Sequence, residues 1–239
     1  MRSSPPRWLV NEGEGRLPSS SRPPICANST SRSPRRATQS RFTHSSFEEE
    51  NRGAAEYKTL QDYLFHAIAA EAGRLGMAVH FHTGAGVGAY FDLTGADPLN
   101  LEPVFDDPAL RKTKFVLLHG GWPFEKSTGF LLSKPNVYAD FSYQSFLLSP
   151  EMLSQTIKTW LIMAPEKVLF ATDAAAITPE VNWEEVGWLS NRTGRRALAI
   201  AITELLREGE ITRPRAMQIA QMVLRDNAMK LYGTGLGHA

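Results

Sequence analysis

Apolar residues recur at three- and four-residue spacing between Tyr57 and Leu75, and Gly76 follows them directly. This spacing predicts an amphipathic helix of about eighteen residues that ends at the glycine. The next residues, 77–82, read as a short buried strand, and a long loop rich in glycine follows. The order of helix, tight turn, strand and long loop is typical of a β/α protein.

The same pattern recurs along the rest of the chain. Four parallel strands with helical material after each suit either half of an eight-stranded barrel or a small, open, doubly wound sheet, and spacing alone does not separate the two. In both architectures, ligands bind where the strands end. Further strands are predicted at residues 115–119, 136–141 and 167–172, and further helices at 126–132, at 150–164 with Ser149 as the N-cap, and at about 195–207 and 213–232.

Residues 1–52 have a different composition from the rest, because they are crowded with Ser, Pro and Arg and lack periodic apolar positions. Such a segment is predicted to be a disordered tail, with the folded domain at residues 53–235. An Arg- and Ser-rich start also occurs in organellar transit peptides, although Glu12 and Glu14 interrupt it here.

The balance of charge excludes some classes of partner. With 26 Lys and Arg against 25 Asp and Glu, the net charge of +1 predicts no general attraction to nucleic acid or to a membrane surface, and favours a small-molecule substrate. No apolar run approaches the roughly 20 residues that a membrane span needs. Cys26 is the single cysteine, so an internal disulfide is impossible, and we expect a cytoplasmic protein.

Three of the four predicted strands end in a residue that can bind a metal: His82, His119 and Asp173. Two imidazoles and one carboxylate at one sheet edge suit a divalent transition metal. Asp173 would hold the metal and take a proton from the attacking water. Each residue also has a purely structural alternative: a strand-end histidine is often a packing residue, and Asp173 is a good N-cap for a following helix.

Neighbouring residues extend the candidate site. His80 leaves the same face of its strand as His82, and it is a further ligand, a substrate contact or a packed core histidine. Trp122 is a candidate pocket wall, and the two glycines before it allow the backbone to approach a ligand closely. Tyr138, Asp140 and Ser142 share one face of the third strand, so Asp140 would be buried there and would need a partner.

Taken together and in this order, the sequence phrases around these residues resemble the amidohydrolase-related superfamily. They resemble in particular its group related to decarboxylases and to the amidohydrolase-like domain that is fused to some glutamine synthetases. The resemblance implies a (β/α)₈ barrel in which His82 matches the ligand of the fifth strand, His119 that of the sixth and Asp173 that of the eighth. It rests on residues 79–84, 114–121, 134–138, 165–173 and 219–232.

The chain departs from the family pattern before Tyr57. The family's first strand carries a His-x-His pair and its fourth strand can supply a Lys or Glu ligand, but neither motif precedes the first predicted strand here. We therefore expect a barrel truncated to strands five to eight. Two unpaired strand edges and an uncovered interior would favour a homo-oligomer.

The function implied by the resemblance is a metal-dependent hydrolase that acts on an amide, ester or similar small molecule through a metal-activated water, with zinc as the expected ion. His80, Trp122 and Asp140 are the expected substrate-binding residues. Two alternatives stay open: a decarboxylase of the same superfamily, and a catalytically inactive barrel fragment that acts as an interaction or regulatory module.

Overall fold

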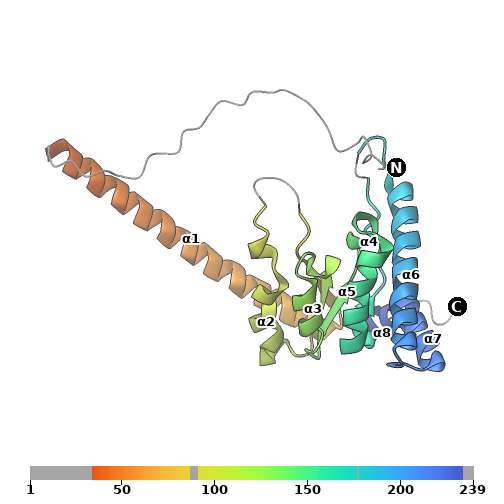
Figure 1. The fold of residues 1–239 in the computed structure, drawn as a ribbon. Helices are drawn as coiled ribbons and strands as arrows, with labels where there is room; N and C mark the ends of the chain where they lie inside the picture. The colour runs from red at the N-terminus through yellow and green to blue at the C-terminus, as the bar shows by residue number, and fades with distance from the viewer. Residues whose placement is uncertain (1–33, 87–90, 177, 234–239) are drawn as a thin grey trace. The chain divides into compact units, whose positions relative to one another are not determined.

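The computed structural model describes residues 34–86, 91–176 and 178–233, with side chains described from Glu56 onward (Figure 1). The chain divides into two compact units, residues 1–55 and 56–239. The second unit contains the whole described sheet and is the one treated below. Residues 1–33 of the predicted disordered tail lie outside the described residues.

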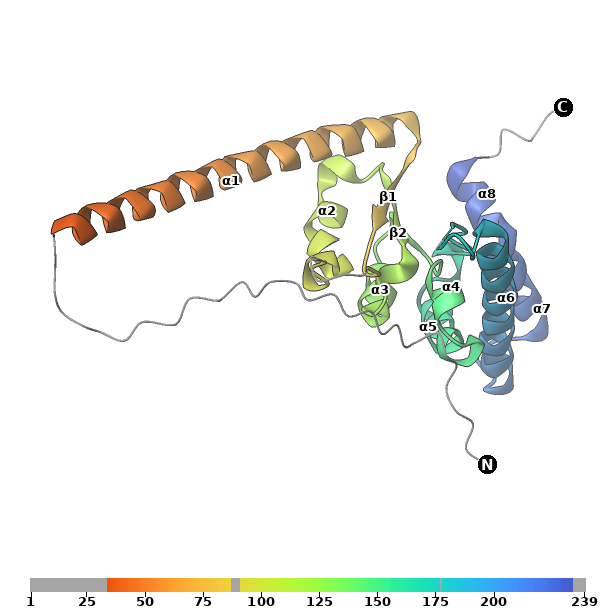
Figure 2. The same cartoon turned by 90° about the horizontal axis from the view of Figure 1, so that it is seen from above.

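The described sheet has four parallel strands in the order of the sequence, β1-β2-β3-β4. Neighbouring strands in the chain are therefore neighbours in space. Figure 2 shows β1 and β2 side by side. The carboxyl ends of the strands meet at one edge of the sheet, which is the prerequisite for the predicted site. The strands are β1 (Ala78–His82), β2 (Lys114–Leu118), β3 (Val137–Asp140) and β4 (Val168–Leu169).

Helical segments separate and follow the strands. Short 3-10 turns lie at Thr94–Ala96, Pro98–Leu101, Pro108–Leu110, His119–Gly121 and Pro165–Lys167, and a π-helical turn lies at Met222–Asp226. The α-helices are α1 (Pro34–Leu75), α2 (Glu102–Asp106), α3 (Glu125–Leu131), α4 (Gln144–Leu147), α5 (Pro150–Met163), α6 (Trp183–Arg207), α7 (Arg213–Gln221) and α8 (Asn227–Tyr232).

The main core lies between one face of the sheet and the helices that connect the strands. Alternate strand residues such as Phe115, Leu117 and Ala139 pack there against α3, α5 and α6. Trp160 of α5 is fully buried in this layer. A doubly wound sheet would instead place connecting helices on both faces. Sequential strand order with the connecting helices on one face is the barrel arrangement, which confirms the predicted fold class.

The opposite face of the sheet carries a smaller cluster that is covered by α8. Val116 and Leu169 are buried against Leu231, with Ala228 beside them. Lys114 Nζ also donates to the carbonyl oxygen of Leu231. This face would be the interior of a complete barrel, and in this chain a C-terminal helix covers part of it.

The far edge of β4 is covered by the π-helical turn before α8 and by the first residue of α8. The Phe170 amide donates to the carbonyl oxygen of Val223 at 3.2 Å. Asn227 Nδ2 donates to the carbonyl oxygens of Pro165 and Val168, both at 2.8 Å. Bonding of Phe170 to a helix instead of a strand explains why β4 is shorter than the predicted 167–172.

The structure corrects two predicted helix boundaries. The helix predicted at 57–75 begins at Pro34 in the structure, and the tail and domain boundary predicted at residue 52 stays a prediction. The helix predicted to start near 195 begins at Trp183, with Asn182 as its cap. Small or polar residues such as Ser190 and Gly194 form the buried side of its first half, so the apolar periodicity is missing there.

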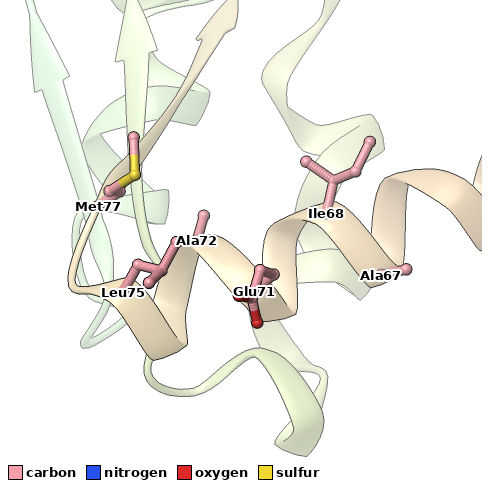
Figure 3. A pocket seen from close by; sticks show the side chains of 6 residues that line it. All are labelled: Ala67, Ile68, Glu71, Ala72, Leu75 and Met77. Carbon is pink, nitrogen blue, oxygen red and sulfur yellow. The ribbon is translucent and has the colours of Figure 1, made fainter.

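An apolar groove lies where α1 meets β1, beside the edge of β1 that has no strand partner among the described residues (Figure 3). Its volume is about 420 Å³. Ile68, Leu75 and Met77 are more than half exposed there. The lining is Ala67, Ile68, Glu71, Ala72, Leu75 and Met77.

Within residues 34–86, 91–176 and 178–233, no helix combines the length and the apolar character that crossing a bilayer requires.

Candidate metal centre

The two predicted histidine ligands lie side by side at the carboxyl edge of the sheet. His82 is the last residue of β1, opposite Leu118, and His119 follows Leu118 directly. Their ring centroids are 4.5 Å apart, with the ring planes at 74°. This parallel register of β1 and β2 brings together two imidazoles that are well separated in the sequence.

Asp173 lies on the same cavity as His119. The cavity has a volume of about 290 Å³ and opens on the face of the sheet that α8 partly covers. Asp173 is exposed and has a positive φ of 53°. The N-cap of the following helix, α6, is Asn182. The alternative prediction that Asp173 caps this helix is therefore wrong.

The three predicted ligands do not converge into a complete metal site in the part of the chain that the structure describes. No group of three His, Cys, Asp or Glu side chains there is arranged to hold an ion. The rings of His82 and His119 lie close together, and imidazole is a common ligand of divalent ions, so these two residues are the ones that would hold such an ion. Asp173 contributes a carboxylate at the same edge of the sheet, as the third donor of the predicted set.

His119 is held by contacts to its ring and to its backbone. Nδ1 lies 2.9 Å from Ser142 Oγ, and the His119 amide donates to Asp140 Oδ1 at 3.0 Å. Gln144 Nε2 donates to the His119 carbonyl oxygen at 2.8 Å. Burial lowers the pKa of the His119 imidazole, while the negative charges of Asp140 and Asp173 oppose that change. The ring is therefore biased toward the neutral form that a metal ligand needs.

Asp140 is buried, as predicted, and its partners are now identified. Oδ1 accepts from the amides of His119 and Ser142, each at 3.0 Å, and from the hydroxyl of Ser142. Burial raises the pKa of the Asp140 carboxyl, and these donors act in the opposite direction. Asp140 also lines the cavity, so its predicted role in substrate binding stays a prediction.

His80 lies on the cavity and is exposed, which rules out a packed core histidine. The hydroxyl of Tyr232 lies 2.9 Å from His80 Nε2, so α8 contributes a side chain to the same cavity. Trp122 does not line this cavity, and its ring lies 6.4 Å from that of Tyr143. The role of Trp122 in substrate binding stays a prediction without a contact to the described cavity.

Gly120 and Gly121 serve protein packing, and the structure shows no space for a ligand beside them. A Cβ at Gly120 would lie 2.0 Å from the Trp160 ring, and one at Gly121 would lie 2.6 Å from Pro98. Both glycines have positive φ angles, of 53° and 68°. The close approach that these glycines allow in the structure is to core side chains, and an approach to a ligand stays a prediction.

Three residues of the site were not singled out as functional from the sequence: Ser142, Gln144 and Tyr232. Ser142 was visible as a member of the face that carries Asp140, since the two are two positions apart. Gln144 and Tyr232 carried no local signal, because their contacts join segments that only the fold brings together.

Comparison with known proteins identifies the family. The protein-family model for amidohydrolases, Amidohydro_2, matches residues 43–234. Protein fluG of Emericella nidulans is 28% identical over 184 residues, which cover 74% of this chain and 20% of fluG. The crystal structure of a protein classed as a metal-dependent hydrolase, from Lactobacillus casei ATCC 334, superposes with a TM-score of 0.63 at 26% identity.

The superposition covers 72% of this chain and 43% of the Lactobacillus casei protein. The chain therefore spans less than half of that protein and about a fifth of fluG. The family match includes all four described strands, His82 and His119 at the ends of β1 and β2, and Asp173, which lies four residues after β4. The chain belongs to the amidohydrolase family.

Proposed function

We propose that this chain carries the metal-binding edge of a metal-dependent hydrolase, with His82 and His119 as ligands and Asp173 as ligand and proton acceptor. The observation that carries the proposal is the 4.5 Å separation of the two imidazole rings at the carboxyl edge of the sheet. Barrel enzymes bind their ligands at this edge of the sheet, so two neighbouring imidazoles there favour a ligand-binding role over a purely structural one.

The donor set favours zinc. Imidazole nitrogens and one carboxylate are ligands that this ion accepts, although manganese, iron and nickel accept them as well. When bound, a divalent ion lowers the pKa of water toward neutrality and polarises a carbonyl group. Membership of the amidohydrolase family and the likeness to a protein classed as a metal-dependent hydrolase both support this chemistry.

The chain's own residues supply the remaining steps. Asp173 is exposed on the cavity, where its carboxylate can take a proton from the attacking water and return it to the leaving group. His80 and Tyr232, which share a hydrogen bond on the cavity wall, would contact the substrate. The substrate class is an amide, an ester or a similar small molecule with an electrophilic carbon.

A specific observation favours the competing proposal of a catalytically inactive domain. Among the described residues, no three potential ligands converge. An interaction or regulatory module needs the fold but not the third ligand. Metal uptake separates the two proposals.

The test is metal content by elemental analysis of the purified full chain after dialysis against metal-free buffer. We expect close to one divalent ion per chain in the wild type and none in a His82→Ala, His119→Ala double variant. His66→Ala is the matched control, because this imidazole lies on α1, paired with Asp107 and away from the sheet edge. Absence of metal in the wild type would support the inactive module.

A loaded protein would then be screened against amides and esters, with release of carbon dioxide from carboxylic acids monitored in parallel. Hydrolysis that is lost in Asp173→Asn supports the proposed role of this carboxylate. Release of carbon dioxide without hydrolysis would instead identify a decarboxylase.

A further inference from the structure

The end of β3 and the segment that follows it hold His119 on several sides. Asp140, Ser142 and Gln144 contact the amide, the ring and the carbonyl oxygen of this residue. His119 has a φ of 63°, a left-handed conformation that is rare for residues other than glycine. Three side chains therefore hold the backbone and the ring of a residue that has an unfavourable backbone conformation.

The hydrogen bonds around Asp140 determine where the proton of the Ser142 hydroxyl lies. Asp140 Oδ1 accepts from two backbone amides, which can only donate. Oδ1 is therefore an acceptor in its third contact as well, the short one with Ser142 Oγ. The hydroxyl proton of Ser142 must point at Asp140.

A serine hydroxyl has one proton, so Ser142 Oγ has none left for His119. The 2.9 Å contact between Oγ and His119 Nδ1 therefore takes its proton from the ring. Neutral imidazole carries one N–H, and in this ring it lies on Nδ1. Nε2 keeps its lone pair free, which is the state that binds a metal ion or accepts a proton.

We propose that Ser142 and Asp140 are positioning residues that fix His119 in the Nδ1–H tautomer and so present Nε2 as the ligand atom. The consequence for metal binding rests on the function proposed above, whereas the tautomer itself follows from the contacts alone. Outer residues of this kind typically change metal affinity by about 10- to 100-fold when they are removed.

The ring nitrogen shifts of His119 in the NMR spectrum of the metal-free full chain test the tautomer. His119→Gln assigns the signal. We expect Nδ1–H in the wild type and in Ser142→Thr, which keeps a hydroxyl, and mixed tautomers in Ser142→Ala. Ser145→Ala is the matched control, because it deletes a neighbouring buried hydroxyl that has no hydrogen-bond partner among the described residues. This variant should keep the wild-type signal.

Zinc affinity, measured by calorimetry on the same variants, tests the consequence. We expect a loss of about 10- to 100-fold in Ser142→Ala, recovery in Ser142→Thr and no change in Ser145→Ala. A wild-type ring protonated at Nε2, or a tautomer that Ser142→Ala leaves unchanged, would overturn the inference. If Ser142→Ala does not fold, the wild-type and Ser142→Thr spectra still decide the tautomer.

The two proposals fail in different ways. An Nδ1–H ring in a protein that takes up no metal would leave the positioning role intact and remove the proposed hydrolase. Metal uptake with the proton on Nε2 of the free ring would keep the metal site and contradict the role of Ser142.

Discussion

Gly120 lies directly after His119, and its missing side chain leaves the space that the Trp160 ring occupies. The nearest ring atom would be 2.0 Å from a Cβ, and the Asp140 carbonyl oxygen would be 3.0 Å away. Trp160 is itself fixed, because its Nε1 donates to the carbonyl oxygen of Glu125. This glycine therefore couples the strand end that carries the candidate ligand to the largest buried side chain of the core.

Gly120→Ala should destabilise the protein by about 3 kcal/mol, since overpacking of the core adds to the cost of a positive φ. Gly209→Ala is the matched control, with a φ of 79° and nothing within 4 Å of the new Cβ, and should cost about 1 kcal/mol. Urea unfolding of both variants measures the difference. An equal decrease in the free energy of unfolding of the two variants would show that Trp160 moves aside at no energetic cost.

The buried carboxyl of Asp140 shows how a single residue serves both structure and site. Its Oδ1 joins the end of β2 to the segment after β3 through the amides of His119 and Ser142. Without these donors the group would be costly to bury. With these donors, the Asp140 carboxylate holds the backbone of His119 directly and the His119 ring through Ser142.

At the scale of elements, the edge of β4 shows how the sheet is terminated. An unpaired strand edge exposes amide and carbonyl groups that attract other strands. Here the Asn227 amide, at the start of α8, satisfies the carbonyl oxygens of Pro165 and Val168. A single side chain thus satisfies one carbonyl group of β4 and one of the turn that precedes this strand.

Asn227→Ala should destabilise the protein by about 2 kcal/mol, because two carbonyl groups in a largely buried region lose their donor. Asn100→Ala removes an exposed amide that donates to the Thr94 carbonyl oxygen, and we expect a change within about 0.5 kcal/mol. Thermal and urea unfolding compare the two variants. A small effect at Asn227 would mean that water replaces its side chain at the strand edge.

At the scale of the whole molecule, the two edges of the described sheet differ in what covers them. The edge of β4 is covered, whereas the described edge of β1 adjoins the exposed apolar groove of α1 (Figure 3). Exposed apolar surface beside a free strand edge favours association. The predicted homo-oligomer would therefore form at β1 and not at β4.

We expect concentration-dependent self-association in sedimentation experiments, and its loss in an Ile68→Glu, Leu75→Glu double variant. Both side chains line the groove and are exposed, so the folded monomer should tolerate the change. Met152→Glu is the control, since this residue is equally exposed on α5 and away from the groove. A wild type that stays monomeric at high concentration would contradict the prediction.

The sequence alone predicted the strands, because four short apolar runs that alternate with helical patterns are typical of parallel strands in a β/α protein. It also placed His82, His119 and Asp173 at strand ends, and the order of its phrases resembled the family that the comparisons then confirmed. These features are local: each depends on the spacing of residues within one segment. The start of α6 was missed because its first half buries small and polar residues.

The spacing of residues left a barrel and a doubly wound sheet open, because the face that each helix covers is not encoded in spacing. The family resemblance implied the barrel, and the tertiary structure showed the connecting helices on one face of the sheet. Only the tertiary structure decided that His80 meets Tyr232, that Gly120 packs on Trp160, and that Ser142 links Asp140 to His119. Each of these contacts joins different segments of the chain, so it exists only after the strands have paired and the helices have packed. The local pattern determined which residues reach the edge of the sheet, and the packing of distant segments determined what each of them contacts there.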